Sequence, residues 1–222
     1  MNVVVLKVGG ASTGGVADAV AALRATGYSV CVVHGAGPQI SEEMVRRGLD
    51  VEFVGGRRVT TAAGLEVVRE SIAAVNDAVC AAIGPDAVGL AGDEAGLEAE
   101  HVPELGLVGH PVPSAPAAVV EALEAGLVPV LSPLARGPLN VNADEAASAL
   151  AVGIGAARIH FLTDVPGVFH DGELLQSISA GRAATLVGDG TFEGGIVPKL
   201  LAAARAAQSG LVAEIGATAV VA

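Results

Sequence analysis

Lysine is almost absent from this chain of 222 residues. Lys7 and Lys199 are its two lysines, whereas the other ten basic side chains are arginines. A chain that uses arginine wherever a positive charge suffices keeps lysine where a compact ammonium on a flexible stem is needed. Stabilising a phosphoryl group during transfer is one such task. Each lysine also lies near a glycine pair, Gly9-Gly10 or Gly194-Gly195, so we favour a functional role over chance composition.

Aromatic residues and cysteines are also scarce. Aromatics make up 2% of the chain and tryptophan is missing, so a core must be built from the alanine, valine, leucine and isoleucine that dominate its 52% hydrophobic content. The two cysteines, Cys31 and Cys80, show no CxxC spacing and no nearby ligand cluster, which argues against a metal site and for free thiols in a reducing compartment. No signal peptide and no membrane-spanning run is recognisable, so we expect a cytoplasmic protein without a membrane partner.

Positive charge is in deficit overall. The net charge is −12 and the sequence pI is about 4.7, which excludes the basic surface typical of nucleic-acid binding. An anionic substrate must therefore be held by a local cluster of positive charge and backbone amides. The length suits residues 1–222 as a single domain with two lobes. A stretch rich in proline and glycine, Pro133–Asn140, suggests lobes over residues 1–137 and 138–222.

What the chain does contain is a regular alternation of strand and helix patterns. Continuous apolar runs predict buried strands at 2–8, 28–33, 87–90, 127–131, 158–162, 211–214 and 217–221. Helical patterns occupy 16–25, 62–83, 115–125, 143–151, 178–187 and 198–209, another helix starts at Pro38, and 97–112 is typical of a hairpin. This order predicts an α/β fold with a mainly parallel sheet covered by helices on both faces.

Glycine-rich or polar turns follow three of these strands, after Val8, Val33 and Leu162. The carboxyl ends of parallel strands share one edge of a sheet, where ligands bind, so the three turns predict one site. Walker and dinucleotide glycine motifs are absent. We expect His34 to be a structural residue bonded to backbone rather than a catalyst. In the Arg57-Arg58 pair, one arginine could clamp a substrate carboxylate, and we expect Arg57 to be an exposed residue.

Six motifs, in this order, carry a resemblance over the whole chain: KVGG, HGAGP, GGRRVT, NVNADEAA, LTDVPGV and GGIVPKL. Together they resemble the amino acid kinase family, and most of all its members that phosphorylate N-acetyl-L-glutamate in arginine biosynthesis. The resemblance implies a three-layer αβα sandwich around a mainly parallel sheet. It also implies ATP with Mg²⁺, transfer of the γ-phosphoryl group to the γ-carboxylate of N-acetyl-L-glutamate, and a homodimer. The N-terminal lobe would bind the acyl substrate and the C-terminal lobe the nucleotide.

The resemblance also implies roles for individual residues. Lys7 and Lys199 would stabilise the transferring phosphoryl group, with Asp144 positioning both. Ala36, Gly37, Arg58 and Asn140 would bind the acyl substrate, Arg58 through its α-carboxylate. The nucleotide and its phosphates would be bordered by Gly9, Gly10, Asp164, Val165, Pro166, Gly167, Val168, Phe169, Thr191, Phe192 and Glu193. No residue is implied as a protein ligand of a resident metal.

Two positions depart from the family pattern, and two other functions remain open. Ala36 replaces the usual glycine and Ile196 a common methionine, and we expect activity to survive both. One alternative is a related kinase that acts on aminoadipate or glutamate attached to an acidic carrier protein, which the net charge of −12 disfavours. The other is a non-catalytic sensor of amino acids or nucleotides, which would not need two lysines and Asp144 together.

Overall fold

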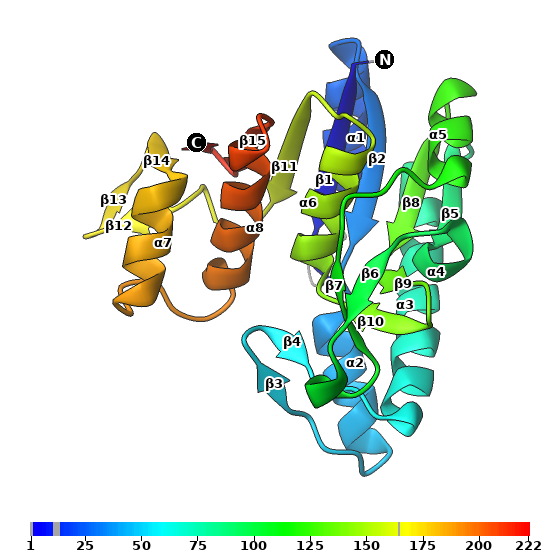
Figure 1. Ribbon diagram of the computed structural model, residues 1–222. Coiled ribbons are helices and arrows are strands. Elements are labelled where there is room, and N and C mark those ends of the chain that lie inside the picture. The colour runs from blue at the N-terminus through cyan, green and yellow to red at the C-terminus, as the bar shows by residue number, and fades with distance from the viewer. Residues whose placement is uncertain (1, 11–13, 164) are drawn as a thin grey trace.

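The computed structural model describes residues 2–10, 14–163 and 165–222, and an eight-stranded sheet runs through its centre (Figure 1). Neighbouring strands of this sheet are parallel, except that β15 and β16 are antiparallel. The α/β fold with a mainly parallel sheet is therefore confirmed. In spatial order the strands are β14 (Ser177–Ser179), β16 (Thr218–Val221), β15 (Val212–Ile215), β11 (Arg158–Leu162), β1 (Val3–Val8), β2 (Ser29–His34), β8 (Val128–Ser132) and β5 (Ala87–Ala91).

Helices pack on both faces of this sheet. One face is covered by α1 (Val16–Ala25), α2 (Gly37–Arg46) and α3 (Ala62–Ile83), and the other by α5 (Ala117–Glu124), α6 (Ala143–Gly153), α7 (Ala180–Gly188) and α8 (Ile196–Gln208). Successive residues of a strand point to opposite faces. In β1, Leu6 and Val8 pack towards α1 and α3, whereas Val3 and Val5 pack towards α5 and α6. Lys7 shares the parity of Val3 and Val5, so the strand itself directs Lys7 towards α6.

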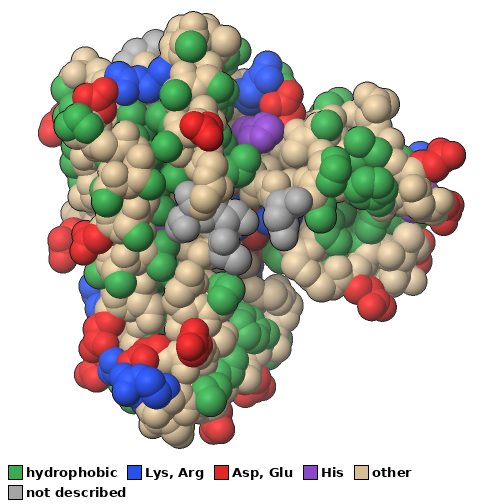
Figure 2. All heavy atoms as spheres, turned by 180° about the vertical axis from the view of Figure 1, so that it is seen from behind, with side chains coloured by type: hydrophobic (Ala, Val, Ile, Leu, Met, Phe, Trp, Pro, Cys, Tyr) green, Lys and Arg blue, Asp and Glu red, His purple; other side chains and the backbone are tan. Residues whose placement is uncertain are grey.

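The edge of the sheet formed by β14, β16 and β15 is covered less completely than its centre. Ala213, Ile215 and Val220 are buried in the cluster that contains α7 and α8. Val212 and Val221, which have the opposite parity, are 48% and 47% exposed. Viewed from behind, the part of the molecule that contains these strands shows a gathering of hydrophobic side chains (Figure 2). Within the described residues, the three-layer arrangement is thus most complete around β1, β2 and β8.

Smaller elements extend from this framework. A second sheet joins β6 (Ala99–His101), β7 (Val108–Pro111), β10 (Leu139–Val141) and β9 (Leu134–Ala135), in that order. Strands β6 and β7 are antiparallel, which confirms the hairpin predicted over 97–112. Two further hairpins pair β3 (Phe53–Val54) with β4 (Arg57–Arg58) and β12 (Phe169–His170) with β13 (Glu173–Leu174). The short α4 (Gly92–Ala95) and a 3₁₀ turn, Pro103–Leu105, complete the set.

Two segments of the chain differ in detail from the sequence-based expectation. The helix predicted over 178–187 is wrong at its start, because Ser177–Ser179 forms β14 and α7 begins at Ala180. The Ser179 side chain caps this helix by accepting from the Arg182 amide at 3.2 Å, so the chain becomes helical only after it. The stretch Pro133–Asn140 contains β9 and the start of β10, and the division into two lobes stays a prediction.

Candidate active site

Three strand ends meet at one edge of the main sheet, as the sequence predicts. Val8 of β1 lies opposite His34 of β2 and Leu162 of β11. The first two turns are packed tightly: a Cβ placed on Gly10 would lie 2.9 Å from the Ala36 Cα atom and 2.9 Å from the Gly35 carbonyl oxygen. Glycine at position 10 is therefore needed for this close approach of two backbone segments.

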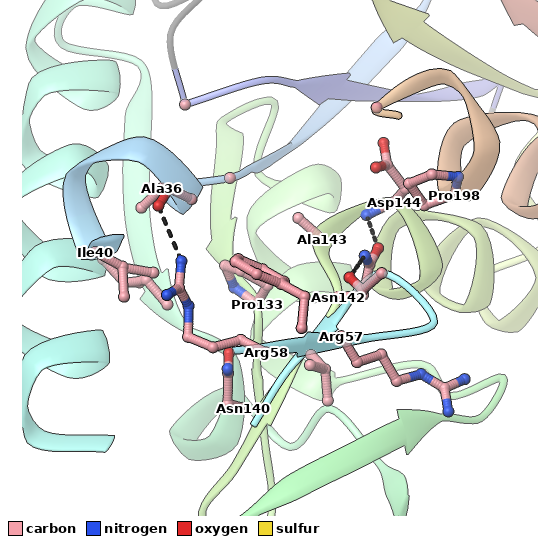
Figure 3. Close-up of a pocket in the computed structure, with 18 of the residues that line it drawn as sticks. Ala36, Ile40, Arg57, Arg58, Pro133, Asn140, Asn142, Ala143, Asp144 and Pro198 are labelled. Carbon is pink, nitrogen blue, oxygen red and sulfur yellow. Dashed lines mark hydrogen bonds between the residues drawn. The ribbon is translucent and has the colours of Figure 1, made fainter. Parts of the chain in front are cut away.

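A cavity of about 350 Å³ opens beside this edge, and the predicted substrate and phosphoryl-binding residues line much of it (Figure 3). Its walls come from β1, the start of α2, the hairpin β3–β4, β10 and the starts of α6 and α8. Seven of the predicted residues lie in its wall, namely Lys7, Gly10, Ala36, Gly37, Arg58, Asn140 and Asp144.

Lys7, Asp144 and Lys199 form one cluster beside this cavity, in which Lys7 and Asp144 line the wall and Lys199 contacts Asp144. The Asp144 Oδ1 atom lies 2.7 Å from Lys7 Nζ and 3.3 Å from Lys199 Nζ, so both ammonium groups share one carboxylate oxygen. Asp144 lies in the first turn of α6, where the Asn142 side chain caps the helix by accepting from the amides of Asp144 and Glu145. Lys199 lies in the first turn of α8. Two cations and one anion leave a local charge of about +1.

Burial and mutual attraction both act on the ionisation of this cluster. Burial lowers the pKa of Lys7, and the nearby Lys199 charge lowers it further, whereas Asp144 acts in the opposite direction. Burial alone would raise the pKa of Asp144, but the charges of Lys7 and Lys199 outweigh it and lower that pKa below its usual value. Asp144 is therefore an anion that holds two ammonium groups together in a poorly hydrated position.

Arg58 is a buried arginine, 5% exposed, that faces the same cavity. It donates to the Gly37 carbonyl at 3.0 Å and to the Ser41 hydroxyl at 2.8 Å, and it stacks on the Phe53 ring at 4.5 Å. Burial lowers its pKa, and none of the salt bridges in the described part of the chain includes it. A buried guanidinium without a carboxylate partner is well suited to bind the carboxylate of a ligand.

The structure contradicts the prediction that Arg57 is an exposed residue. It was expected to be exposed, but its side chain is 21% exposed and forms a bidentate ion pair with Glu145, with both nitrogen–oxygen distances at 2.9 Å. The physical reason is the alternation along β4, which sends neighbouring arginines in opposite directions. Figure 3 shows Arg57 pointing away from Arg58.

Asn140 and His34 are held by other side chains. Asn140 is 8% exposed and donates to the Thr60 hydroxyl at 3.0 Å. His34 is fully buried on the α3 face, where its Nε2 atom lies 3.0 Å from the Asn76 amide nitrogen. This agrees with the structural role that we expect for His34, and the partner of Nε2 is a side chain of α3.

A second cavity, of about 300 Å³, is lined in part by Lys199. Gly195 lines both cavities, so the two spaces adjoin at the start of α8. Of the predicted nucleotide-binding residues, Gly9 and Val165 line it, whereas Asp164 lies outside the described residues. Its wall is formed by Gly9, Leu162, Thr163, Val165, Gly195, Ile196 and Lys199.

The remaining predicted nucleotide-binding residues are spread over two segments. Val168 and Phe192 are 1% and 8% exposed and belong to the main core cluster. Their side chains therefore anchor the two segments to the hydrophobic core. A Cβ on Gly167 would meet the Thr218 hydroxyl at 2.6 Å, which explains glycine there. The exposed members are Pro166, Phe169, Thr191 and Glu193. Their contact with a nucleotide stays a prediction.

Sequence reasoning missed three residues that shape the site. Gln39 donates to the Gly10 carbonyl at 2.7 Å and so ties the two glycine turns together. Phe53 stacks on Arg58, and Glu145 binds Arg57. Glu145 lies inside a quoted motif and Phe53 just before one. Glu145 and Arg57 are 88 residues apart, so no local signal identifies that pair, whereas Phe53 meets Arg58 through the register of the β3–β4 hairpin.

Comparisons with known proteins agree with this geometry. The amino acid kinase family pattern matches residues 2–216. Acetylglutamate kinase of Rubrobacter xylanophilus is 40% identical, over 97% of this chain and 88% of the relative, and that of Geobacillus kaustophilus is 37% identical, over 94% and 86%. Among solved structures, smu.665 from Streptococcus mutans UA159 superposes with a TM-score of 0.90 at 23% identity, covering 99% of this chain and 98% of the other. N-acetylglutamate synthase from Neisseria gonorrhoeae superposes with a TM-score of 0.84 at 21% identity, covering 100% of this chain and 59% of the other. The chain belongs to the amino acid kinase family.

Proposed function

We propose that this protein is an acetylglutamate kinase, which transfers the γ-phosphoryl group of ATP to the γ-carboxylate of N-acetyl-L-glutamate in arginine biosynthesis. One observation carries the proposal. A buried guanidinium without a carboxylate partner, Arg58, shares a cavity with Lys7 and Asp144, and Asp144 also holds Lys199. A carboxylate-binding group and a phosphoryl-binding group thus face one space of about 350 Å³. The curated relatives with acetylglutamate kinase names support the choice of substrate.

The substrate end of the cavity suits an acylated amino acid. Contacts with the Gly37 carbonyl and the Ser41 hydroxyl orient the Arg58 guanidinium for paired hydrogen bonds with an α-carboxylate. The amides of Ala36 and Gly37 lie at the start of α2, where the helix dipole favours negative charge. The Asn140 amide supplies further polar contacts beside them.

The chemistry requires positioning and charge more than proton transfer. The acceptor carboxylate is already ionised at neutral pH, so the reaction needs no general base. One of its oxygens forms a bond to the γ-phosphorus, and the bond from that phosphorus to the β–γ bridging oxygen breaks, releasing ADP. Lys7 and Lys199 donate to the oxygens of the group in transfer, and Asp144 holds the two ammonium groups 2.7 and 3.3 Å from one oxygen beforehand.

The nucleotide is assigned to the second cavity, which lies beside Lys199 and Gly9. Gly195 lines both cavities, so the γ-phosphate of a nucleotide bound there would lie close to the two lysines. The amides of Gly9 and Gly10 follow β1 directly and are suited to bind phosphate oxygens. The segments 164–169 and 191–193 would border the base and ribose.

Magnesium fits this site as a companion of the nucleotide. The described residues contain no group of three or more metal-ligating side chains, so Mg²⁺ would be held by phosphate oxygens and water. When bound, it neutralises charge on the β- and γ-phosphates. The protein's own contribution is the pair of lysines and the carboxylate of Asp144.

A coupled assay for ADP release tests the proposal. We expect turnover with ATP, Mg²⁺ and N-acetyl-L-glutamate, and little or none with free glutamate or aminoadipate. Turnover that requires an acidic carrier protein would replace the proposal by the carrier-linked kinase. Binding of ATP and acetylglutamate without turnover would indicate a sensor.

We further propose that the enzyme acts as a cytoplasmic homodimer, as its resemblance to the family implies. The described part of the chain contains no helix that is both long and apolar enough to cross a membrane. Light scattering after size-exclusion chromatography measures the mass directly, and a monomer would contradict the proposal for the oligomer.

A further inference from the structure

Glu145 is a largely buried carboxylate next to Asp144 that the proposed mechanism does not use. Its side chain is 12% exposed and follows Asp144 in the first turn of α6. Two arginines from two elements donate to it, Arg57 of β4 through two hydrogen bonds at 2.9 Å and Arg205 of α8 through one at 3.2 Å. His110 of β7 lies 3.7 Å from Glu145, and its Nδ1 atom is closer to Arg57 Nη2, at 2.6 Å.

The arrangement repeats that of its neighbour Asp144. Asp144 holds one base from β1, Lys7, and one from α8, Lys199. Glu145 holds one base from β4, Arg57, and one from α8, and both donate to its Oε1 atom. Two consecutive carboxylates thus tie α8 to elements earlier in the chain. Asp144 joins the two lysines to each other, and Glu145 joins the β3–β4 hairpin to α8.

The hairpin β3–β4 depends on such polar contacts for its position. It contributes Phe53 and Arg58 to the cavity, yet Phe53 and Val54 are 52% and 49% exposed, so apolar packing holds it weakly. Its tip is held by the Asn142 side chain, which donates to the Gly56 carbonyl at 3.0 Å. Arg57 supplies the second attachment to α6, and it adjoins Arg58 in the same strand.

We propose that Glu145 is a positioning residue that holds the β3–β4 hairpin over the acyl-substrate cavity and couples it to α8. Glu145 acts through Arg57 on the placement of Arg58, and through Arg205 on the helix that carries Lys199. The inference rests on the proposed function, because Arg58 is assigned there to the substrate carboxylate. Glu145 itself is assigned no contact with N-acetyl-L-glutamate or with ATP.

Kinetic variants test this role. Glu145→Gln keeps the size and removes the charge, and Arg57→Gln removes the hairpin's partner. Each should raise the KM for N-acetyl-L-glutamate about tenfold, because a misplaced binding group costs at least that much. The KM for ATP should rise less in Arg57→Gln than in Arg205→Gln. Glu145→Asp, which keeps the negative charge, should raise the KM for N-acetyl-L-glutamate less than Glu145→Gln does.

The decisive measurement is the coupling between variants. In the Glu145→Gln background, Arg57→Gln should change the KM by less than about twofold, whereas independent residues would multiply their effects. Glu214→Gln is the matched control, since Glu214 also accepts two hydrogen bonds from an arginine, from Arg158 Nη1 at 2.9 and 3.0 Å, but does not line the cavity. Unchanged KM in Glu145→Gln, or multiplied effects, would overturn the proposal.

A readout without substrate separates this inference from the proposed function. Hydrogen exchange of the amides in 53–60 should be faster in Glu145→Gln than in wild type and unchanged in Glu214→Gln. That result would support the positioning role even if acetylglutamate were not the substrate, and equal exchange in all three proteins would overturn it. If Glu145→Gln does not fold, the double variant of Arg57 and Arg205 serves instead, because both donate to the same Glu145 oxygen. Independent effects in that double variant would also contradict the proposal.

Discussion

His34 should make the protein less stable as the pH falls from about 6.5 to about 4. The Asn76 amide nitrogen donates one hydrogen to the Val130 carbonyl at 2.9 Å and faces His34 Nε2 at 3.0 Å. Its second hydrogen therefore points at Nε2, which must accept and carry no proton of its own. A charged imidazole would place two donors against each other in a fully buried position.

The size of the effect follows from the pKa of this group. Burial, assisted by the charge of Lys7, lowers the pKa of His34 from 6.5 to about 4. At about 1.36 kcal/mol for each pH unit, the difference corresponds to about 3 kcal/mol. Because the folded-state pKa is the lower one, the unfolded chain binds the extra proton between these two values. The free energy of unfolding is therefore highest above pH 6.5 and falls as the pH decreases towards 4.

Urea unfolding at about pH 7 and about pH 4.5 measures this loss. Carboxylates also titrate in this range, so the informative quantity is the difference between wild type and His34→Gln. Glutamine keeps an oxygen that accepts from Asn76 but cannot gain a charge. We expect wild type to lose about 2–3 kcal/mol more than His34→Gln over this interval. An exposed histidine, His101, provides the control His101→Gln, which should behave as wild type. Equal losses in wild type and His34→Gln would refute the reasoning.

Four further outcomes concern the site itself. Lys7→Arg and Lys199→Arg should each lower kcat by a factor equivalent to about 2.7–4 kcal/mol with little change in ATP affinity, and near-normal turnover would contradict their role. Asp144→Asn should destabilise the fold by about 3–5 kcal/mol, because two ammonium groups lose their shared anion, and thermal unfolding measures it. Arg58→Lys should mainly raise the KM for acetylglutamate, since lysine cannot reproduce the paired contacts or the stacking on aromatic carbon; an unchanged KM would place the clamp elsewhere. Gly10→Ala should cost about 1–3 kcal/mol of stability, because its Cβ would lie 2.9 Å from backbone atoms of the facing turn.

The architecture, and the edge of the sheet at which the site lies, could be predicted from the order of residues along the chain. Apolar runs of strand length alternate with helical patterns, and this order permits few folds other than a mainly parallel α/β sheet. Strand parity also places Lys7 on the same face of its strand as Val3 and Val5. Because glycine-rich or polar turns follow three strands, their meeting at one edge could be predicted before any contact was known. The six motifs identified Lys7, Asp144 and Lys199, although 55 residues separate the last two.

The pairing of charged residues, in contrast, is visible only in the folded protein. Arg57 and Arg58 are identical in type and adjacent, yet one pairs with Glu145, 88 residues away, and the other stays without a carboxylate. Asn76 likewise contacts His34 across 42 residues. Ion pairs and hydrogen bonds depend on distances of a few ångströms between side chains that the chain brings together only after the sheet and its helices are packed. A local pattern shows that an arginine is present and on which side of a strand it lies, but the folded protein decides what it binds.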